Sequence, residues 1–196
     1  DWTPMAQAYA VLVKEDATWV GGLDETQVLR DGTWRVVQPD NGRLRHVLAM
    51  TGLPDGGVLM GGWRGVWYAA PGAETVSLLE AETPVGAVRH LRLEHGLLWI
   101  STVDRGLCVA KPTAAALEQL RCLEASSALG RGTVHATLTD HLGRTWISSN
   151  QGIGVVPTEA LLDYAAGGPE PAALWLGTGD GMRSAEGNGF FGDAGV

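Results

Sequence analysis

The chain has 196 residues, which predicts one domain, and its 28 Gly, 8 Trp and 18% charged residues favour short strands joined by tight turns over a helical bundle. The formal net charge is −8 and the 14 Lys and Arg residues are scattered, so we do not expect nucleic acid as a partner. No apolar run reaches the roughly 18 residues that a membrane helix needs, and we expect no membrane contact within this segment.

A short strand motif recurs four times along the chain, with its central positions 19, 59, 99 and 146 separated by 40, 40 and 47 residues. A period of about 40–50 residues is typical of the blades of a β-propeller. The motif occupies Thr18–Gly22, Val58–Gly62, Leu98–Thr102 and Thr145–Ser149. We therefore interpret residues 1–196 as a single propeller segment, with units of approximately 5–45, 46–89, 90–134 and 135–196.

Further strands are expected around the motif in each unit. In the second, third and fourth units an apolar strand precedes the motif, and another follows it at the turn glycines Gly65, Gly106 and Gly152. Glycine supplies the positive φ that a hairpin turn requires. With an outer strand drawn from the variable stretch of each unit, this order predicts an all-β fold: a β-propeller of four-stranded antiparallel blades, forming an incomplete arc of about four blades.

The tryptophans of the motif are expected to pack in the core rather than to bind a ligand. Each blade packs both of its faces against neighbours, so its central strands are almost continuously apolar. Trp19, Trp99 and Trp146 would each bury a large area, and the small Gly or Ser residues beside them let the next sheet approach. We therefore nominate none of the motif residues as part of a binding site.

The end of the fourth unit contains a further copy of the motif, Leu174–Thr178, only 29 residues after Trp146. A whole blade does not fit in that interval, so we expect this copy to form the outer strand of the fourth blade. A short helix or turn is expected before it, over residues 158–165, with Thr158 as a candidate N-cap and Gly167–Gly168 as its end.

The repeats resemble those of the two-component regulator propeller family, in which an Asp-x-Gly turn leads into Leu-Trp-Ile-Gly-Thr and then into Gly-Leu. Residues 94–107 and 140–153 are the most similar to this pattern, and the similarity covers about residues 10–156. The segment Asp180–Gly189 is similar to one found before the last blade of such sensors. The first two units depart from the pattern: the first lacks the turn glycine, and Leu59 replaces the Trp of the second.

This resemblance implies the extracytoplasmic or periplasmic input region of a bacterial membrane receptor. Such a region binds a ligand and passes its state to an output domain, either a histidine kinase or a diguanylate cyclase, that lies outside this chain. The segment itself would not be an enzyme and would need no cofactor. The partners implied are a small-molecule or oligosaccharide ligand and the output domain of the same receptor; a homodimer is a further candidate.

Polar residues near the start of successive first strands are candidates for the wall of a central channel, where propellers bind ligands. His46, His90 and His135 are 44 and 45 residues apart, and Arg45 and Arg89 precede the first two. Imidazole suits an anionic or metal-linked ligand. The alternative is that these side chains cap strand ends and contact water. The sequence predicts no specific metal site.

Two further choices stay open at the level of sequence. The loop candidates Asp180, Glu186 and Asn188 either meet a ligand or bond their own backbone in turns. Cys108 and Cys122 are the two cysteines of the chain, and they form either one disulfide or two buried free thiols. A disulfide would indicate an extracytoplasmic compartment.

Three functions are therefore compared. The favoured one is a sensory binding module. The second is a propeller lyase resembling streptogramin lyase, in which a channel histidine acts as general base with a divalent metal. The third is a protein-interaction scaffold. The sequence contains no His-Glu-x-x-His or phosphate-loop pattern, and no Ser-His-acid triad can be selected from it, so the case for an enzyme is weak.

Overall fold

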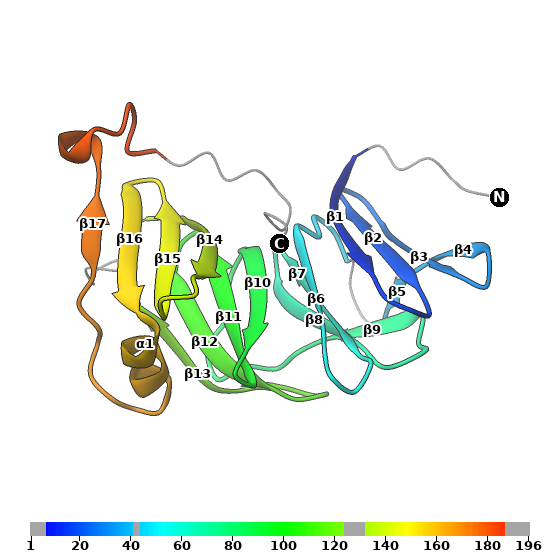
Figure 1. The fold of residues 1–196 in the computed structure, drawn as a ribbon. Helices are drawn as coiled ribbons and strands as arrows, with labels where there is room; N and C mark the ends of the chain where they lie inside the picture. Colours follow the sequence, from blue (N-terminus) through cyan, green and yellow to red (C-terminus); the bar gives the residue numbers. More distant parts are fainter. Residues whose placement is uncertain (1–6, 41–43, 124–131, 187–196) are drawn as a thin grey trace.

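The strands of the chain form four sheets that stand side by side in an open arc (Figure 1). The computed structural model describes residues 7–40, 44–123 and 132–186, and the account below concerns these residues. In every sheet four consecutive strands pair antiparallel in chain order, which is the build of a propeller blade. The predicted all-β class, the four-stranded blades and the incomplete arc of four blades are confirmed.

The blades follow the chain from its first to its last strand. Blade 1 contains β1 (Ala8–Val13), β2 (Thr18–Gly22), β3 (Thr26–Arg30) and β4 (Thr33–Val36). Blade 2 contains β6 (Ala49–Gly52), β7 (Val58–Gly62), β8 (Gly65–Ala69) and β9 (Thr75–Leu78), and the short β5 (Gln38–Pro39) pairs parallel with β9 as a fifth strand. Blade 3 contains β10 (Val88–Glu94), β11 (Leu97–Thr102), β12 (Leu107–Pro112) and β13 (Leu117–Leu123). Blade 4 contains β14 (Val134–Thr139), β15 (Arg144–Ser149), β16 (Gly152–Pro157) and β17 (Leu174–Leu176).

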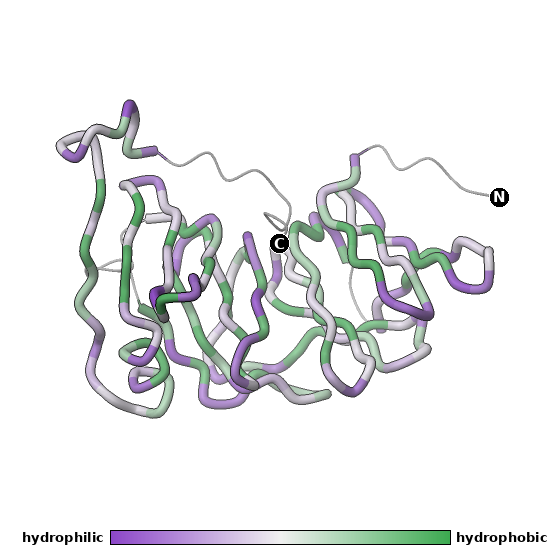
Figure 2. The backbone as a smooth tube through the Cα atoms, in the orientation of Figure 1, coloured by the Kyte–Doolittle hydropathy of each residue, from purple (hydrophilic) through white to green (hydrophobic). Residues whose placement is uncertain are grey.

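The first strand of each blade lies on the inside of the arc. β1 packs beside β6, β6 beside β10, and β10 beside β14, so these four strands line the inner side of the arc. Hydrophobic residues mostly follow the strands, while hydrophilic residues gather in the turns at the two ends of the blades (Figure 2).

Three hydrophobic cores hold the arc together, one between each pair of consecutive blades. Trp19 of blade 1 packs with Val58 and Met60 of blade 2. Leu59 of blade 2 packs with residues of blade 3, and Trp99 of blade 3 with residues of blade 4. The central motif residue of each of these blades therefore faces the following blade, and its two strand neighbours face the preceding one.

Trp146, the central motif residue of blade 4, departs from the expected packing. Its counterparts Trp19, Leu59 and Trp99 are at most 2% exposed, whereas Trp146 is only partly buried. The reason is its place in the arc, because no further blade covers this face of blade 4 among the described residues. The expectation that every motif tryptophan is a core residue is wrong for Trp146.

The turn glycines adopt the backbone conformation that the sequence predicts. Gly65, Gly106 and Gly152 have φ of 127°, 68° and 127°, in the region that side chains rarely occupy. At Gly152 the space is closed as well, because a Cβ would lie 2.3 Å from the carbonyl oxygen of Leu176. This close approach lets β17 pair with β16 at the outer edge of blade 4.

The helix α1 (Thr158–Ala165) lies at the lower end of blade 4 in Figure 1, between β16 and β17. Its predicted bounds are correct, but its predicted cap is not. Pro157 holds the N-cap position without a side-chain hydrogen bond, and the Thr158 hydroxyl instead bonds the Thr145 hydroxyl at 3.0 Å. The buried side chains of Leu161 and Tyr164 extend the core between blades 3 and 4.

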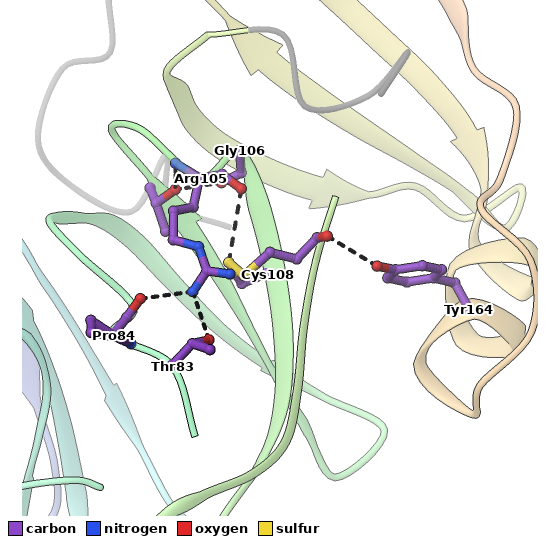
Figure 3. The surroundings of a disulfide bond; sticks show 8 residues. Thr83, Pro84, Arg105, Gly106, Cys108 and Tyr164 are labelled. Atoms are coloured by element: carbon purple, nitrogen blue, oxygen red, sulfur yellow. Dashed lines mark hydrogen bonds between the residues drawn. A yellow bond between two sulfur atoms is a disulfide. The ribbon is translucent and has the colours of Figure 1, made fainter. Parts of the chain in front are cut away.

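A disulfide joins Cys108 to Cys122 across the paired strands β12 and β13, and Figure 3 shows its surroundings. The Tyr164 hydroxyl of α1 donates to the carbonyl oxygen of Cys122 at 3.0 Å. The guanidinium of Arg121, next to that cysteine, lies over the Tyr164 ring. The outer strand of blade 3 is therefore tied both to its own sheet and to the helix of blade 4.

Candidate functional site

Most of the sequence-predicted site residues gather at one end of the blades, which we call the upper end. It contains the starts of β6, β10 and β14 and the turns β7–β8, β11–β12 and β15–β16, because antiparallel strands in chain order bring these to the same side. The segment after β17 returns to this end, while α1 lies at the opposite, lower end (Figure 1). Arg45, His46, Arg89 and His135 all precede or begin an innermost strand.

The candidate histidines of the innermost strands occupy different structural positions. In β1, β10 and β14 the pairing skips one residue, and the skipped residues are Tyr9, Arg89 and His135. His135 therefore corresponds to Arg89, whereas His90 corresponds to Ala136 on the other side of the irregularity. Sequence spacing misses this difference, because a β-bulge moves a side chain without changing the period of the repeat.

A chain of hydrogen bonds at the upper end links blades 3 and 4. Nη2 of Arg89 donates to Nδ1 of His135 at 3.3 Å, and Nε2 of His135 donates to Oδ1 of Asn150 at 2.6 Å. Arg89 comes from β10, His135 from β14 and Asn150 from the β15–β16 turn. The sequence prediction contains the first two of these residues and misses Asn150, whose place in a turn carries no signal of its own.

The protonation state of His135 follows from its surroundings. Burial lowers the pKa of His135 below its usual value, and the charge of Arg89 acts in the same direction, while the bond to Asn150 and the charge of Glu186 oppose them. A neutral imidazole can accept from Arg89 and donate to Asn150 at once, which matches the two observed bonds. The site therefore offers a guanidinium, a neutral imidazole and an amide.

Blade 2 contributes an aromatic side chain to the upper end. Trp63, in the β7–β8 turn, is 62% exposed, and its ring centroid lies 4.9 Å from that of His46. His46 precedes β6 and has a positive φ of 53°, which is uncommon for a residue other than glycine. Arg45 is exposed and lines a shallow hollow with Asp24 and Glu25, away from the Arg89 cluster.

His90 is 9% exposed, about as buried as His135 at 8%, and it borders two hollows. One is a small space of about 50 Å³ shared with Leu48 and Met50, and the other is a cavity of about 320 Å³ lined mainly by blade 4. Trp146 and Thr137 line the larger cavity, and the buried Thr137 hydroxyl has no hydrogen-bond partner among the described residues. Only His90 of the predicted channel residues borders this space.

The three loop candidates, Asp180, Glu186 and Asn188, differ in what the structure shows of them. Asp180, at the end of the short helix η1 (Thr178–Asp180), accepts a bond from the backbone N–H of Gly177 at 2.9 Å through Oδ2. Glu186 is exposed, and its charge reaches the His135 imidazole. Asn188 lies outside the described residues.

At the lower end, blades 3 and 4 are joined by a second polar network, which the sequence prediction missed. Arg92 donates to the Thr139 hydroxyl and pairs with Glu94 at 2.9 Å. The Thr139 hydroxyl donates to Glu94 at 3.0 Å and meets that of Thr145 at 3.3 Å. Burial lowers the pKa of Arg92, and the charge of Glu94 opposes this shift. Because its groups bind one another, this network stabilises the contact between two blades.

Two features are absent from the described part of the chain. No group of three or more His, Cys, Asp or Glu side chains in residues 7–40, 44–123 and 132–186 could hold a metal ion. Within the same ranges, no helix is long and apolar enough to cross a membrane.

The sequence matches no protein family and no curated protein, but the fold resembles many solved structures. PorZ, a surface component of the type-IX secretion system of Porphyromonas gingivalis, has a TM-score of 0.62 at 15% identity, over 84% of this chain and 26% of its own. The extracellular domain of a putative hybrid two component system from B. thetaiotaomicron has a TM-score of 0.57 at 14% identity, over 76% and 20%. The computationally designed protein Ika8 has a TM-score of 0.58 at 15% identity, over 93% and 52%.

These similarities establish the fold and leave the activity open, because sequence identity is low in every case. The chain spans about a fifth of the length of the B. thetaiotaomicron domain and about half of Ika8.

Proposed function

We propose that this chain is part of the ligand-sensing input module of a bacterial receptor, and that the ligand binds at the upper end. The observation that carries the proposal is the hydrogen-bonded chain of Arg89, His135 and Asn150, at the end of the blades that also presents the exposed ring of Trp63. These side chains come from three different blades. A ligand that contacts them would therefore sense the relative position of the blades.

The chemistry of these residues favours a small polar ligand, either an oligosaccharide or a carboxylate-bearing molecule. A guanidinium donates in a fork that suits carboxylates and hydroxyls, and an amide both donates and accepts. An exposed indole ring offers an apolar face beside polar groups, as binding sites for small molecules commonly do. The neutral imidazole of His135 uses its acceptor for Arg89 and its donor for Asn150, and so positions both side chains without adding charge.

The proposed location is the periplasm or another extracytoplasmic space. The Cys108–Cys122 disulfide supports this, because such bonds persist in oxidising compartments. The ligand state would pass to an output domain outside this chain, and the segment itself would do no chemistry. The fold shared with the extracellular domain of a two component system is consistent with this role.

The test is a thermal-shift screen with oligosaccharides, simple sugars, carboxylates and short peptides, followed by calorimetric titration of each compound that raises the Tm. We expect a binder whose affinity falls about tenfold or more in Arg89→Ala and Asn150→Ala, as each removes a direct polar contact. The matched control is His141→Ala, which changes an exposed histidine at the lower end and should leave affinity unchanged.

Three results would overturn the proposal. A screen without any Tm shift, together with a stable protein partner, would favour the interaction scaffold. A stoichiometric divalent metal that is lost in His90→Ala or His135→Ala would favour the lyase. A ligand whose affinity is unaffected by Arg89→Ala, Asn150→Ala and Trp63→Ala would place the binding site elsewhere on the arc.

A further inference from the structure

The backbone around the exposed side chain of Asn150 is held in place by hydrogen bonds at the upper end of blade 4. The backbone N–H of Asn150 donates to the carbonyl oxygen of Thr133 at 3.2 Å. The Ser149 hydroxyl donates to the carbonyl oxygen of Gly152 at 3.1 Å and accepts from the backbone N–H of Gln151 at 3.0 Å. These bonds close the β15–β16 turn, which therefore presents the Asn150 amide from a fixed position.

The direction of the hydrogen bonds through His135 is set by Arg89. A guanidinium has donors and no acceptor, so Nη2 of Arg89 donates and Nδ1 of His135 accepts across their 3.3 Å contact. A neutral imidazole carries one ring proton, which therefore lies on Nε2. The pKa of His135, lowered mainly by burial, agrees with this neutral state.

The proton on Nε2 in turn fixes which atom of the Asn150 amide faces the imidazole. Because Nε2–H of His135 is a donor, the amide atom 2.6 Å away is the oxygen Oδ1. The Nδ2 group of Asn150 is the other branch of the amide, and it makes no hydrogen bond with another residue in the described ranges. His135 is 8% exposed, whereas Asn150 is exposed. The two N–H donors of this amide are therefore available at the surface.

We infer that the upper-end ligand is a hydrogen-bond acceptor, specifically a carboxylate, and that it accepts from the Nδ2 group of Asn150. The inference rests on the proposed function, because it names the class of ligand at that same site. Arg89 contributes only donors, His135 has both ring nitrogens engaged, and Asn150 has its oxygen engaged. The three groups therefore offer donors to a ligand and no acceptor from the imidazole or the amide.

The charge of Arg89 adds to this preference. Hydrogen bonds in a chain polarise one another, so the guanidinium strengthens the donor Nε2–H of His135 and, through it, the N–H groups of Asn150. Bonds to an ionised acceptor are stronger than bonds to a neutral one, which favours a carboxylate over a hydroxyl or carbonyl oxygen. His135 is thus a positioning residue: it orients the amide that touches the ligand.

The first measurement concerns the imidazole alone and needs no ligand. NMR of the ring nitrogens, in the full chain labelled at histidine, reports which nitrogen carries the proton, and His135→Gln identifies the signals of this residue. We expect a proton on Nε2 and an unprotonated Nδ1 near neutral pH. A proton on Nδ1 would reverse the orientation of the Asn150 amide and overturn the inference, while the proposed function would stand.

The second measurement compares two probes that share a phenyl ring, phenylacetate and phenethylamine, by NMR titration at physiological ionic strength. We expect phenylacetate to bind about tenfold or more tightly, because the protonated amine donates and does not accept. Asn150→Asp keeps an acceptor for His135 but replaces the N–H donors by a carboxylate oxygen, and should reduce this ratio about tenfold or more. Gln151→Glu makes the same change in charge at the next exposed residue and is the matched control, with a change below about threefold.

Two further variants test the positioning of the amide and the charge around it. His135→Gln should also reduce the ratio of the two affinities, because its own amide can present either atom to Asn150. The charge of Glu186 reaches the His135 imidazole and opposes an anionic ligand. Glu186→Gln should therefore strengthen phenylacetate binding, by about twofold to threefold at physiological salt.

The outcomes separate this inference from the proposed function. Equal affinity for the two probes, or an unchanged ratio in Asn150→Asp when circular dichroism shows the variant folded, overturns the inference alone. An upper-end ligand from the wider screen that has no acceptor group does the same. An upper-end carboxylate from that screen whose affinity falls in Asn150→Asp supports the inference. A chain that binds no compound at all overturns both.

Discussion

Trp99 and Trp146 occupy the same position of the same motif, yet the structure treats them differently. Trp99 lies between blades 3 and 4, 2% exposed, packed with Val134 and Ile147. Its indole N–H has no hydrogen-bond partner among the described residues. Trp146 is partly exposed, and its indole N–H donates to Oδ2 of Asp140 at 2.8 Å. Trp99 is thus held by packing between two blades, whereas Trp146 is held in part by the hydrogen bond from its indole N–H to Asp140.

This difference teaches that a repeat motif specifies a side chain and a direction, while burial depends on what lies in that direction. The strand Leu97–Thr102 has a blade on both faces and is buried along almost its whole length, whereas Arg144–Ser149 alternates between buried and partly exposed residues. Both strands contain a Trp-Ile-Ser sequence. The predictions below test this comparison.

The largest effect is expected from truncating the two tryptophans. Trp99→Ala should lower the free energy of unfolding by about 3–5 kcal/mol, because it opens a cavity between two blades. Trp146→Ala should lower it by only about 1–2 kcal/mol, because much of the lost contact is already with water. Urea unfolding followed by circular dichroism measures both changes. Equal losses in the two variants would contradict the difference in burial.

The second effect concerns the disulfide, which only blade 3 contains among the described blades. Replacing Cys108 and Cys122 together by Ala should lower the free energy of unfolding by about 2–4 kcal/mol, because the bond limits the unfolded chain. Dithiothreitol should destabilise the wild-type chain by a similar amount and leave the double variant unchanged, which is the control. A wild-type chain that is indifferent to reduction would contradict the prediction.

The smallest effect is expected from the contact between Trp146 and Asp140, as a dependence of stability on pH. The Trp146 N–H and the Arg144 guanidinium donate to Asp140 and hold the pKa of that carboxyl well below its usual range. A lowered pKa stabilises the folded state fully above the usual Asp value of about 3.9, and this contribution is lost as pH falls through the lower folded pKa. Stability should therefore fall on acidification below about pH 4.

Acid titrations of the unfolding midpoint test this sign in two variants. Asp140→Asn should remove the contribution of this carboxyl to the acid dependence. Trp146→Phe, which keeps a ring but removes the N–H donor, should move the transition toward higher pH. A Trp146→Phe chain with the wild-type acid profile would show that Asp140 is stabilised by other donors.

Much of the fold was predictable, because its signals are local. The period of the motif marks the blades, and Gly65 and Gly152 mark hairpin turns through their need for positive φ. The helix 158–165 was also placed correctly, since its Gly-Gly end is a local signal. Its cap was not, because the Thr158 hydroxyl bonds Thr145 on another strand, and that contact exists only after folding.

The candidate site was predictable only in part. His135 and Arg89 stand out as polar residues near strand starts, but their mutual contact depends on equivalent bulges in β10 and β14. Asn150 and Trp63 lie in turns, where a polar or aromatic residue has no distinctive spacing. Sequence spacing grouped His90 with His135, although strand pairing places them at different positions.

The sequence alone determined the number of blades, the order of strands and the core residues Trp19 and Trp99, because these follow from period, turn residues and apolar runs. The tertiary structure alone decided which faces are left uncovered. Trp146 carries the same motif as Trp99, and only the arrangement of the blades shows that its face lies at the end of the arc. A local pattern fixes the direction of a side chain, whereas its burial depends on chain segments far away in the sequence.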